Sequence, residues 1–140
     1  NSAEVTKLVA SFGESLGIAF QILDDVLDVT ASEDLLGKKS GMDLKERKPS
    51  IVNVLWLESG SPLARRLLTP TSEDEDDFYA AALAELRESP IIGEAQQMAR
   101  KYTADAVRSL RSAFELAPNK NLQALEEILT LIDYTTSRTE

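Results

Sequence analysis

The sequence contains no cysteine and no histidine among its 140 residues. The absence of cysteine excludes disulfides, thiolate catalysis and zinc–thiolate sites. The absence of histidine excludes the Ser/His and Cys/His nucleophilic mechanisms and removes most transition-metal sites. Together these two absences leave few catalytic schemes open.

Positive charge and long apolar runs are also scarce. Lys and Arg number 15 against 24 Asp and Glu, a net charge of −9, which argues against nucleic acid or an anionic membrane surface as the principal partner. No uninterrupted apolar run approaches the roughly 18 residues of a membrane span, so we expect no integral membrane protein. We expect a soluble, cytoplasmic protein. An organelle is the alternative, because the chain starts at Asn1 without an initiator Met or a readable targeting segment.

The chain does contain a series of helix-period segments. Its hydrophobic content of 43% supports one modest core, and apolar residues recur at three- and four-residue steps. No segment has the two-residue period of a strand, so we expect an all-α fold. The expected helices cover 4–29, 51–60, a short stretch from Pro62, a stretch from a capping box at Ser72–Glu75 to Leu86, a stretch between Pro90 and Pro118, and 122–132.

Residues 20–28 place three carboxylates in an apolar, helix-period segment that has no basic residue between positions 16 and 29. On a helix Gln21, Asp24 and Asp28 share one face, with Asp25 rotated about 100° aside. Like charges four residues apart repel by roughly 0.2–0.5 kcal/mol, and by more when they are partly desolvated. A divalent cation bound between the carboxylates turns this net repulsion into a net attraction. Carboxylates at this spacing suit Mg²⁺, which commonly binds one or two carboxylates together with a substrate phosphate.

Two other loop motifs fit less well. An EF-hand would require oxygen ligands or its glycine where Val26 and Val29 stand. Gly37–Ser40 is like the end of a phosphate-binding loop, but the earlier glycine is replaced by Ser32 and no strand precedes it. A basic cluster follows the aspartates, and beside them it indicates a diphosphate clamp rather than a solubilising loop. Its members are Lys38, Lys39, Lys45, Arg47 and Lys48.

Two further groups of residues have simple structural interpretations. The acidic run at 73–77 stands at a helix start without apolar surroundings, which indicates a solvated turn that complements the helix dipole. Five aromatic residues are interpreted as packing residues. They are Trp56, Phe78, Tyr79, Tyr102 and Phe114.

The segment Gly17–Asp28 closely resembles the second aspartate-rich motif of trans-type isoprenyl (polyprenyl) diphosphate synthases. The likeness continues through 36–38 and 41–44 to Lys48, and it reaches Ile132–Arg138, which is similar to the closing helix and basic tail of the family. One departure is Arg47-Lys48-Pro49-Ser50, where the family usually has Gly-Lys-x-Thr. The chain resembles the C-terminal portion, residues 1–140, of one all-α synthase domain. The resemblance implies that an N-terminal half, with the first aspartate-rich motif and the residues that gauge product length, is missing from this chain.

The resemblance implies a bundle of helices around a deep pocket, with two aspartate-rich motifs facing each other. It implies that Asp24, Asp25 and Asp28 hold Mg²⁺ on the allylic diphosphate. It assigns catalysis to Asp24, Asp25 and Lys38. It assigns substrate binding to Phe20 and Gln21 at the reacting end of the pocket, and to Lys38 and Lys48 on the allylic diphosphate. Asp43 is placed in a supporting shell, and Arg138 on the side of isopentenyl diphosphate.

The implied reaction is the Mg²⁺-dependent head-to-tail condensation of an allylic diphosphate with isopentenyl diphosphate, which gives a longer all-trans prenyl diphosphate. We expect the chain to be inactive alone, because one carboxylate cluster cannot position both metals and both diphosphates. The expected partner is the N-terminal half, from the same gene or a second chain, in a homodimer or heteromer. A class I terpene cyclase is one alternative, although its usual Asn, Ser or Thr and Glu motif is missing. A non-catalytic regulatory subunit of a prenyl synthase is the other.

Overall fold

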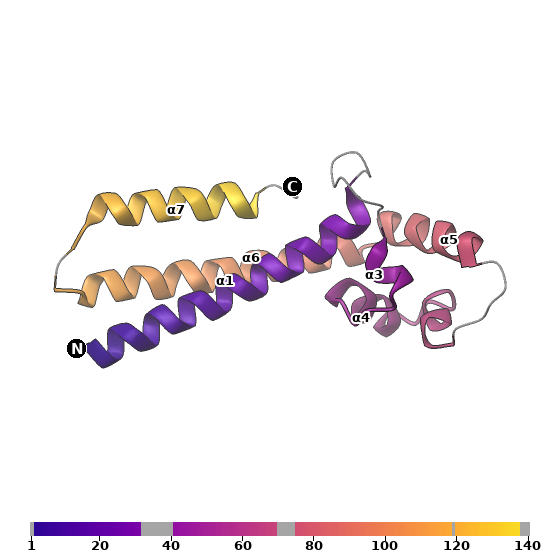
Figure 1. Cartoon of the computed structure of the whole chain (residues 1–140), viewed down its shortest axis with the longest axis horizontal. Coiled ribbons are helices and arrows are strands. Elements are labelled where there is room, and N and C mark those ends of the chain that lie inside the picture. Colours follow the sequence, from indigo (N-terminus) through magenta and orange to yellow (C-terminus); the bar gives the residue numbers. More distant parts are fainter. Residues whose placement is uncertain (1, 32–40, 70–74, 119, 138–140) are drawn as a thin grey trace. The chain divides into compact units, whose positions relative to one another are not determined.

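The computed structural model describes residues 2–31, 41–69, 75–118 and 120–137. These ranges are helical and contain no strand, which confirms the expected all-α class. The helices are α1 (Ser2–Thr30), α3 (Met42–Lys45), α4 (Ile51–Glu58), the 3₁₀ helix η1 (Ala64–Leu68), α5 (Glu75–Glu88), α6 (Ile91–Leu116) and α7 (Leu122–Thr136) (Figure 1).

The long helices follow the predicted pattern, and the differences lie in the short segments. Helix α3 was not predicted, because four residues are too few to display a helical period. The short helix expected from Pro62 begins at Ala64 and is a 3₁₀ helix. Helix α5 begins at Glu75, and the other residues of the expected capping box lie outside the described ranges.

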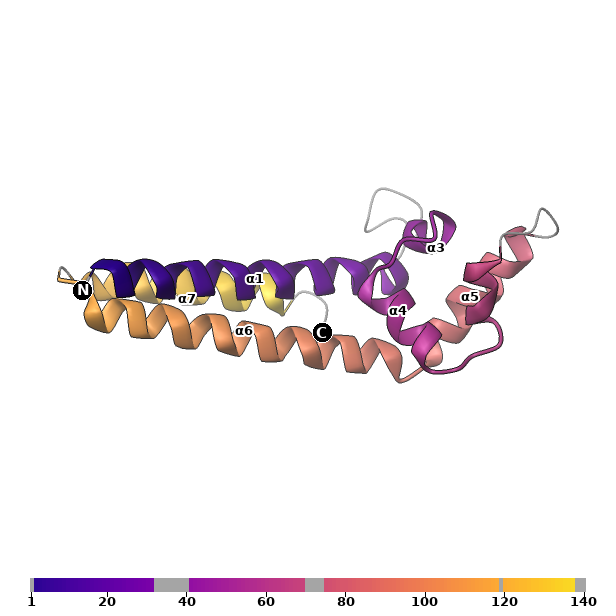
Figure 2. The ribbon, with the colours of Figure 1, turned by 90° about the horizontal axis from the view of Figure 1, so that it is seen from below.

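One compact unit comprises Asn1–Leu23 and Gln97–Glu140. In it the first part of α1, the later part of α6 and α7 lie side by side, with α6 antiparallel to both neighbours (Figures 1 and 2). Asn121 caps α7, since its side-chain oxygen accepts the backbone N–H of Ala124 at 3.0 Å. The core of this unit consists of buried Leu110, Leu125 and Ile132, against which Phe12, Leu16, Val107, Phe114, Ile128 and Leu129 pack.

The other unit, Asp24–Gln96, contains the predicted site. Its buried residues include Trp56, which is 1% exposed, and the fully buried Leu44 and Leu86. The end of α1 is fixed within this unit, because Arg87 Nε donates to the Val29 carbonyl at 2.7 Å. This bond satisfies one of the carbonyls that a helix leaves unpaired at its C-terminus.

Membrane-spanning helices are not found in the part of the chain that the structure describes, because none of its helices is both long and apolar enough.

Candidate functional site

The three motif aspartates occupy the last two turns of α1, and they differ in exposure. Asp24 is exposed, whereas Asp25 and Asp28 are 7% and 4% exposed. Each buried carboxylate accepts a backbone N–H through its Oδ2: Asp28 from Asp43 at 3.1 Å, and Asp25 from Ile51 at 3.0 Å. These bonds offset part of the cost of burying the two charges. They also tie the first turns of α3 and α4 to the end of α1.

Burial divides the motif differently from the predicted face. The prediction grouped Asp28 with Asp24 and Gln21, yet Gln21 and Asp24 are exposed and Asp28 is buried together with Asp25. The reason is tertiary, because Asp28 lies between the other two around the helix axis, about 40° from Asp24 and about 60° from Asp25, and the start of α3 covers it through the bond from the Asp43 N–H. Within the described ranges no three Asp or Glu side chains lie close enough to form a ready metal site. The joint assignment of Mg²⁺ to all three aspartates therefore stays a prediction.

One oxygen of the motif is suited to a cation. Asp28 Oδ1 is buried and has no hydrogen-bond partner among the described residues. Buried carboxylate oxygens are normally satisfied, so an unpaired one indicates a missing donor, water or ion. Mg²⁺ prefers hard carboxylate oxygens, and the exposed Asp24 stands one turn earlier on the same helix. The donor set of this helix end thus fits Mg²⁺.

The loop after α3 carries Lys48. Its exposed Nζ lies 3.2 Å from Glu46 Oε2 and 3.7 Å from Asp43 Oδ1. The hydrogen bond and charge of Glu46 raise the pKa of Lys48 above its ordinary value of 10.5. The charge of Asp43 adds to this pKa shift, desolvation opposes it, and the charge of Asp28 adds least. Lys48 is therefore cationic at neutral pH, as a diphosphate contact requires.

The structure does not test the roles predicted for four other site residues. Lys38 and Arg138 lie outside the described residues, so their roles stay predictions. Phe20 is half-buried and Gln21 exposed on α1, and both belong to the other unit. Their place at the reacting end of a pocket also stays a prediction.

The backbone conformation of Arg47 gives a reason why glycine is usual at this position of the family motif. Its φ of 52° lies in the left-handed region, which glycine adopts without steric cost and arginine rarely does. Two side-chain contacts offset part of the steric cost of this backbone conformation: Nε of Arg47 donates to the Leu67 carbonyl at 3.1 Å, and its guanidinium lies 3.9 Å from Glu75 Oε1. Glu75 takes part in this ion pair while its side chain stays 43% exposed, and Asp76 and Asp77 are exposed as expected.

Asn53 was not among the residues predicted for the site. This residue is 2% exposed on α4, and its Nδ2 donates to the Lys48 carbonyl at 2.8 Å and to the Asp43 carbonyl at 3.2 Å. The signal was a lone amide inside the apolar run Ile51–Leu57. A buried polar group in such a run normally has a specific partner.

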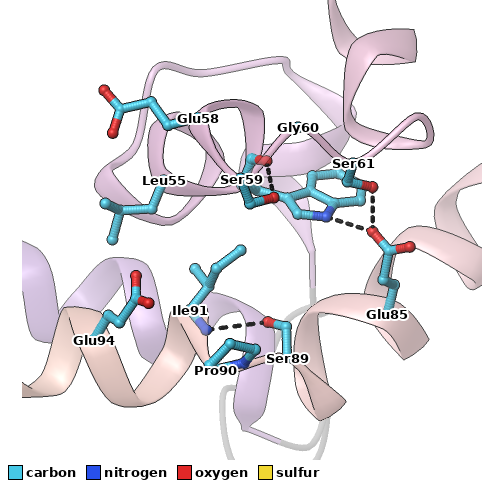
Figure 3. A pocket seen from close by; sticks show the side chains of 11 residues that line it. Leu55, Glu58, Ser59, Gly60, Ser61, Glu85, Ser89, Pro90, Ile91 and Glu94 are labelled. Carbon is cyan, nitrogen blue, oxygen red and sulfur yellow. Dashed lines mark hydrogen bonds between the residues drawn. The ribbon is translucent and has the colours of Figure 1, made fainter.

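A cavity of about 420 Å³ lies elsewhere in the same unit, between α4, the segment after it and the junction of α5 and α6 (Figure 3). Its charged lining residues are Glu58, Glu85 and Glu94, and none of the described residues that line it is a lysine or arginine. Glu85 Oε2 already accepts the indole N–H of Trp56 and the hydroxyl of Ser61. An anionic lining without a cation repels phosphate, so this cavity is a poor diphosphate site.

Comparison with known proteins identifies similar chains. Residues 1–86 match the family described as polyprenyl synthetase. A nonaprenyl diphosphate synthase of Mycobacterium tuberculosis is 33% identical over 137 residues, which cover 96% of this chain and 39% of the relative. A geranylgeranyl diphosphate synthase of Methanosarcina mazei is 31% identical over 137 residues, which cover 98% and 40%.

A solved structure supports the same likeness. The crystal structure of a heptaprenyl diphosphate synthase from Staphylococcus aureus superposes with a TM-score of 0.73 at 26% identity, over 93% of this chain and 39% of that one. The chain therefore spans only about two fifths of the length of these three proteins.

Proposed function

The chain belongs to the polyprenyl synthetase family, and from this premise we propose that it is the C-terminal part, residues 1–140, of an all-trans isoprenyl diphosphate synthase domain. The complete enzyme condenses an allylic diphosphate with isopentenyl diphosphate to give a longer prenyl diphosphate. The single observation that supports this most is the end of α1, where a buried oxygen of Asp28 has no partner among the residues that the structure describes, one turn after the exposed Asp24.

The roles of the residues follow from their chemistry. Asp24 and Asp28, with Asp25 between them, would hold Mg²⁺, which neutralises diphosphate charge and assists its departure when bound. Lys48 adds positive charge to the departing diphosphate, as we expect of Lys38 also. Ionisation leaves an allylic cation, which the double bond of isopentenyl diphosphate attacks before a proton is lost to the released diphosphate. Apolar walls near Phe20 and Gln21 keep water from the cation, and Arg138 is assigned to isopentenyl diphosphate.

The proposal includes a partner. One cluster of carboxylates cannot hold the metal ions that two diphosphates need. We therefore assign a second cluster to an N-terminal half that carries the first aspartate-rich motif. That half belongs to the same polypeptide or to a second chain, and the assembled enzyme is a homodimer or heteromer.

Asp24→Ala in the complete synthase tests the proposal. We expect kcat/KM for prenyl transfer to fall by at least about 100-fold, since the loss of one preorganised electrostatic group commonly has that effect. Asp76→Ala is the matched control, because Asp76 is exposed on the first turn of α5 and should leave turnover unchanged. Undiminished turnover of the Asp24 variant would instead favour a regulatory subunit. Hydrocarbon products would favour a terpene cyclase.

A further inference from the structure

A backbone hydrogen bond joins the two ends of the loop that carries Lys48. The backbone N–H of Lys48 donates to the Asp43 carbonyl at 2.9 Å, which brings the two ends of the segment 43–48 together. Between them the chain turns through Arg47 in the left-handed region. A non-glycine residue in this sparsely populated conformation persists because the surrounding structure fixes it, and not because the residue itself favours it.

Asn53 spans these two ends from the adjacent helix. One N–H of its amide meets the Lys48 carbonyl at 2.8 Å and the other meets the Asp43 carbonyl at 3.2 Å. The opposite orientation of the amide would turn Oδ1 toward two carbonyl oxygens, so the network itself fixes the assignment. Asn53 Oδ1 is then left buried without a partner among the described residues. An apolar residue would avoid that cost, which indicates that the two donors are what the position requires.

The helix that carries Asn53 is itself anchored to the motif. Ser50 Oγ accepts the backbone N–H of Asn53 at 3.1 Å and caps α4, while Asp25 Oδ2 accepts the N–H of Ile51 at 3.0 Å. A continuous set of hydrogen bonds therefore runs from the aspartate motif through α4 and Asn53 to the Lys48 backbone.

We propose that Asn53 is a positioning residue for the diphosphate contact Lys48: it holds the segment 43–48 in the one arrangement that presents the Lys48 ammonium beside the aspartate motif. The inference rests on the proposed function only for the diphosphate role of Lys48. The tether itself is a statement about the loop, and it can be tested separately.

The first measurement is amide hydrogen exchange of residues 43–51 in the complete synthase. Asn53→Leu removes both donors at similar volume, and we expect exchange in this segment to become at least about tenfold faster, since one hydrogen bond to a buried group is worth about a factor of ten. Asn121→Leu is the matched control, because it removes an asparagine that caps α7 in the other unit. It should lower the melting temperature and leave exchange of residues 43–51 unchanged.

The second measurement is the affinity for inorganic pyrophosphate with Mg²⁺ in a double-mutant cycle. Lys48→Met should weaken binding about tenfold, as the loss of a charged hydrogen bond does. Asn53→Leu should weaken it by a smaller factor, and should add no further loss in the Lys48→Met background because it acts through Lys48. Should Asn53→Leu fail to fold, Asn53→Ser keeps one donor and is expected to show the same effects in weaker form.

The outcomes separate the two ideas. Faster exchange with non-additive losses supports the inference. Unchanged exchange, or losses that simply add, overturns it. Faster exchange with unaltered pyrophosphate affinity in both single variants retains the tether and overturns the diphosphate role of Lys48, which is part of the proposed function.

Discussion

At the scale of single residues, Gly41 is the position where the backbone most clearly requires glycine. Its φ is 77°, its N–H donates to the Asp28 carbonyl at 2.8 Å, and an added Cβ would lie 3.1 Å from Leu83 Cδ2. We expect Gly41→Ala to lower the free energy of unfolding by about 1–2 kcal/mol, because a left-handed conformation costs an L-residue that much. Urea denaturation followed by circular dichroism measures the change.

The control for this prediction is Gly13→Ala. Gly13 lies within α1 with nothing within 4 Å of its added Cβ, so alanine should raise the free energy of unfolding by up to about 1 kcal/mol. Equal losses in the two variants would contradict the assigned conformation of Gly41.

The conformation of Arg47 and the partners of Asp25 and Asp28 could not be predicted from the sequence. The position of Arg47 was identified as a departure from the family motif, but only the φ of 52° gives the physical reason for glycine there. The partners of Asp28 and Asp25 are backbone groups 15 and 26 residues further along the chain. No local pattern encodes such long-range bonds, so the carboxylates were predicted and their division into buried and exposed groups was not.

At the scale of elements, α7 offers a direct test of helix orientation. Ile132 is 5% exposed in the core of its unit, whereas its neighbour Leu131 is 64% exposed. Ile132→Ala should cost about 2–5 kcal/mol of stability, as cavity-forming substitutions do, while Leu131→Ala should change it by less than about 0.5 kcal/mol. Chemical denaturation of the two variants makes the comparison. Similar losses at both positions would show that α7 presents a different face to the core.

The helices differ in how well their sequence predicts them. Helices α1, α6 and α7 are long enough for an apolar stripe to repeat several times, and the sequence located each of them to within a few residues. Helix α3 has four residues and is held by the Asp28 carboxylate at its start. Its formation depends on a tertiary contact, so the sequence alone could not locate it.

At the scale of the whole molecule, the proposal predicts that these 140 residues are catalytically incomplete. Prenyl transfer from labelled isopentenyl diphosphate, with an allylic diphosphate and Mg²⁺, should be undetectable for this chain and robust for the complete synthase. The physical reason is electrostatic, because one cluster of carboxylates cannot hold the metal ions needed to neutralise two diphosphates at once. Robust turnover by the chain alone would show that the residues described here suffice.

Trp56 has a practical consequence for spectroscopic measurements on this chain. It is the single tryptophan of the sequence, it is 1% exposed, and its indole N–H is bonded to Glu85 within the unit Asp24–Gln96. Tryptophan fluorescence, excited at wavelengths that the three tyrosines scarcely absorb, therefore has one emitter in this chain, and the emitter belongs to the same unit as the aspartate motif. A red shift of the emission spectrum reports the opening of that unit specifically, in the unlabelled protein.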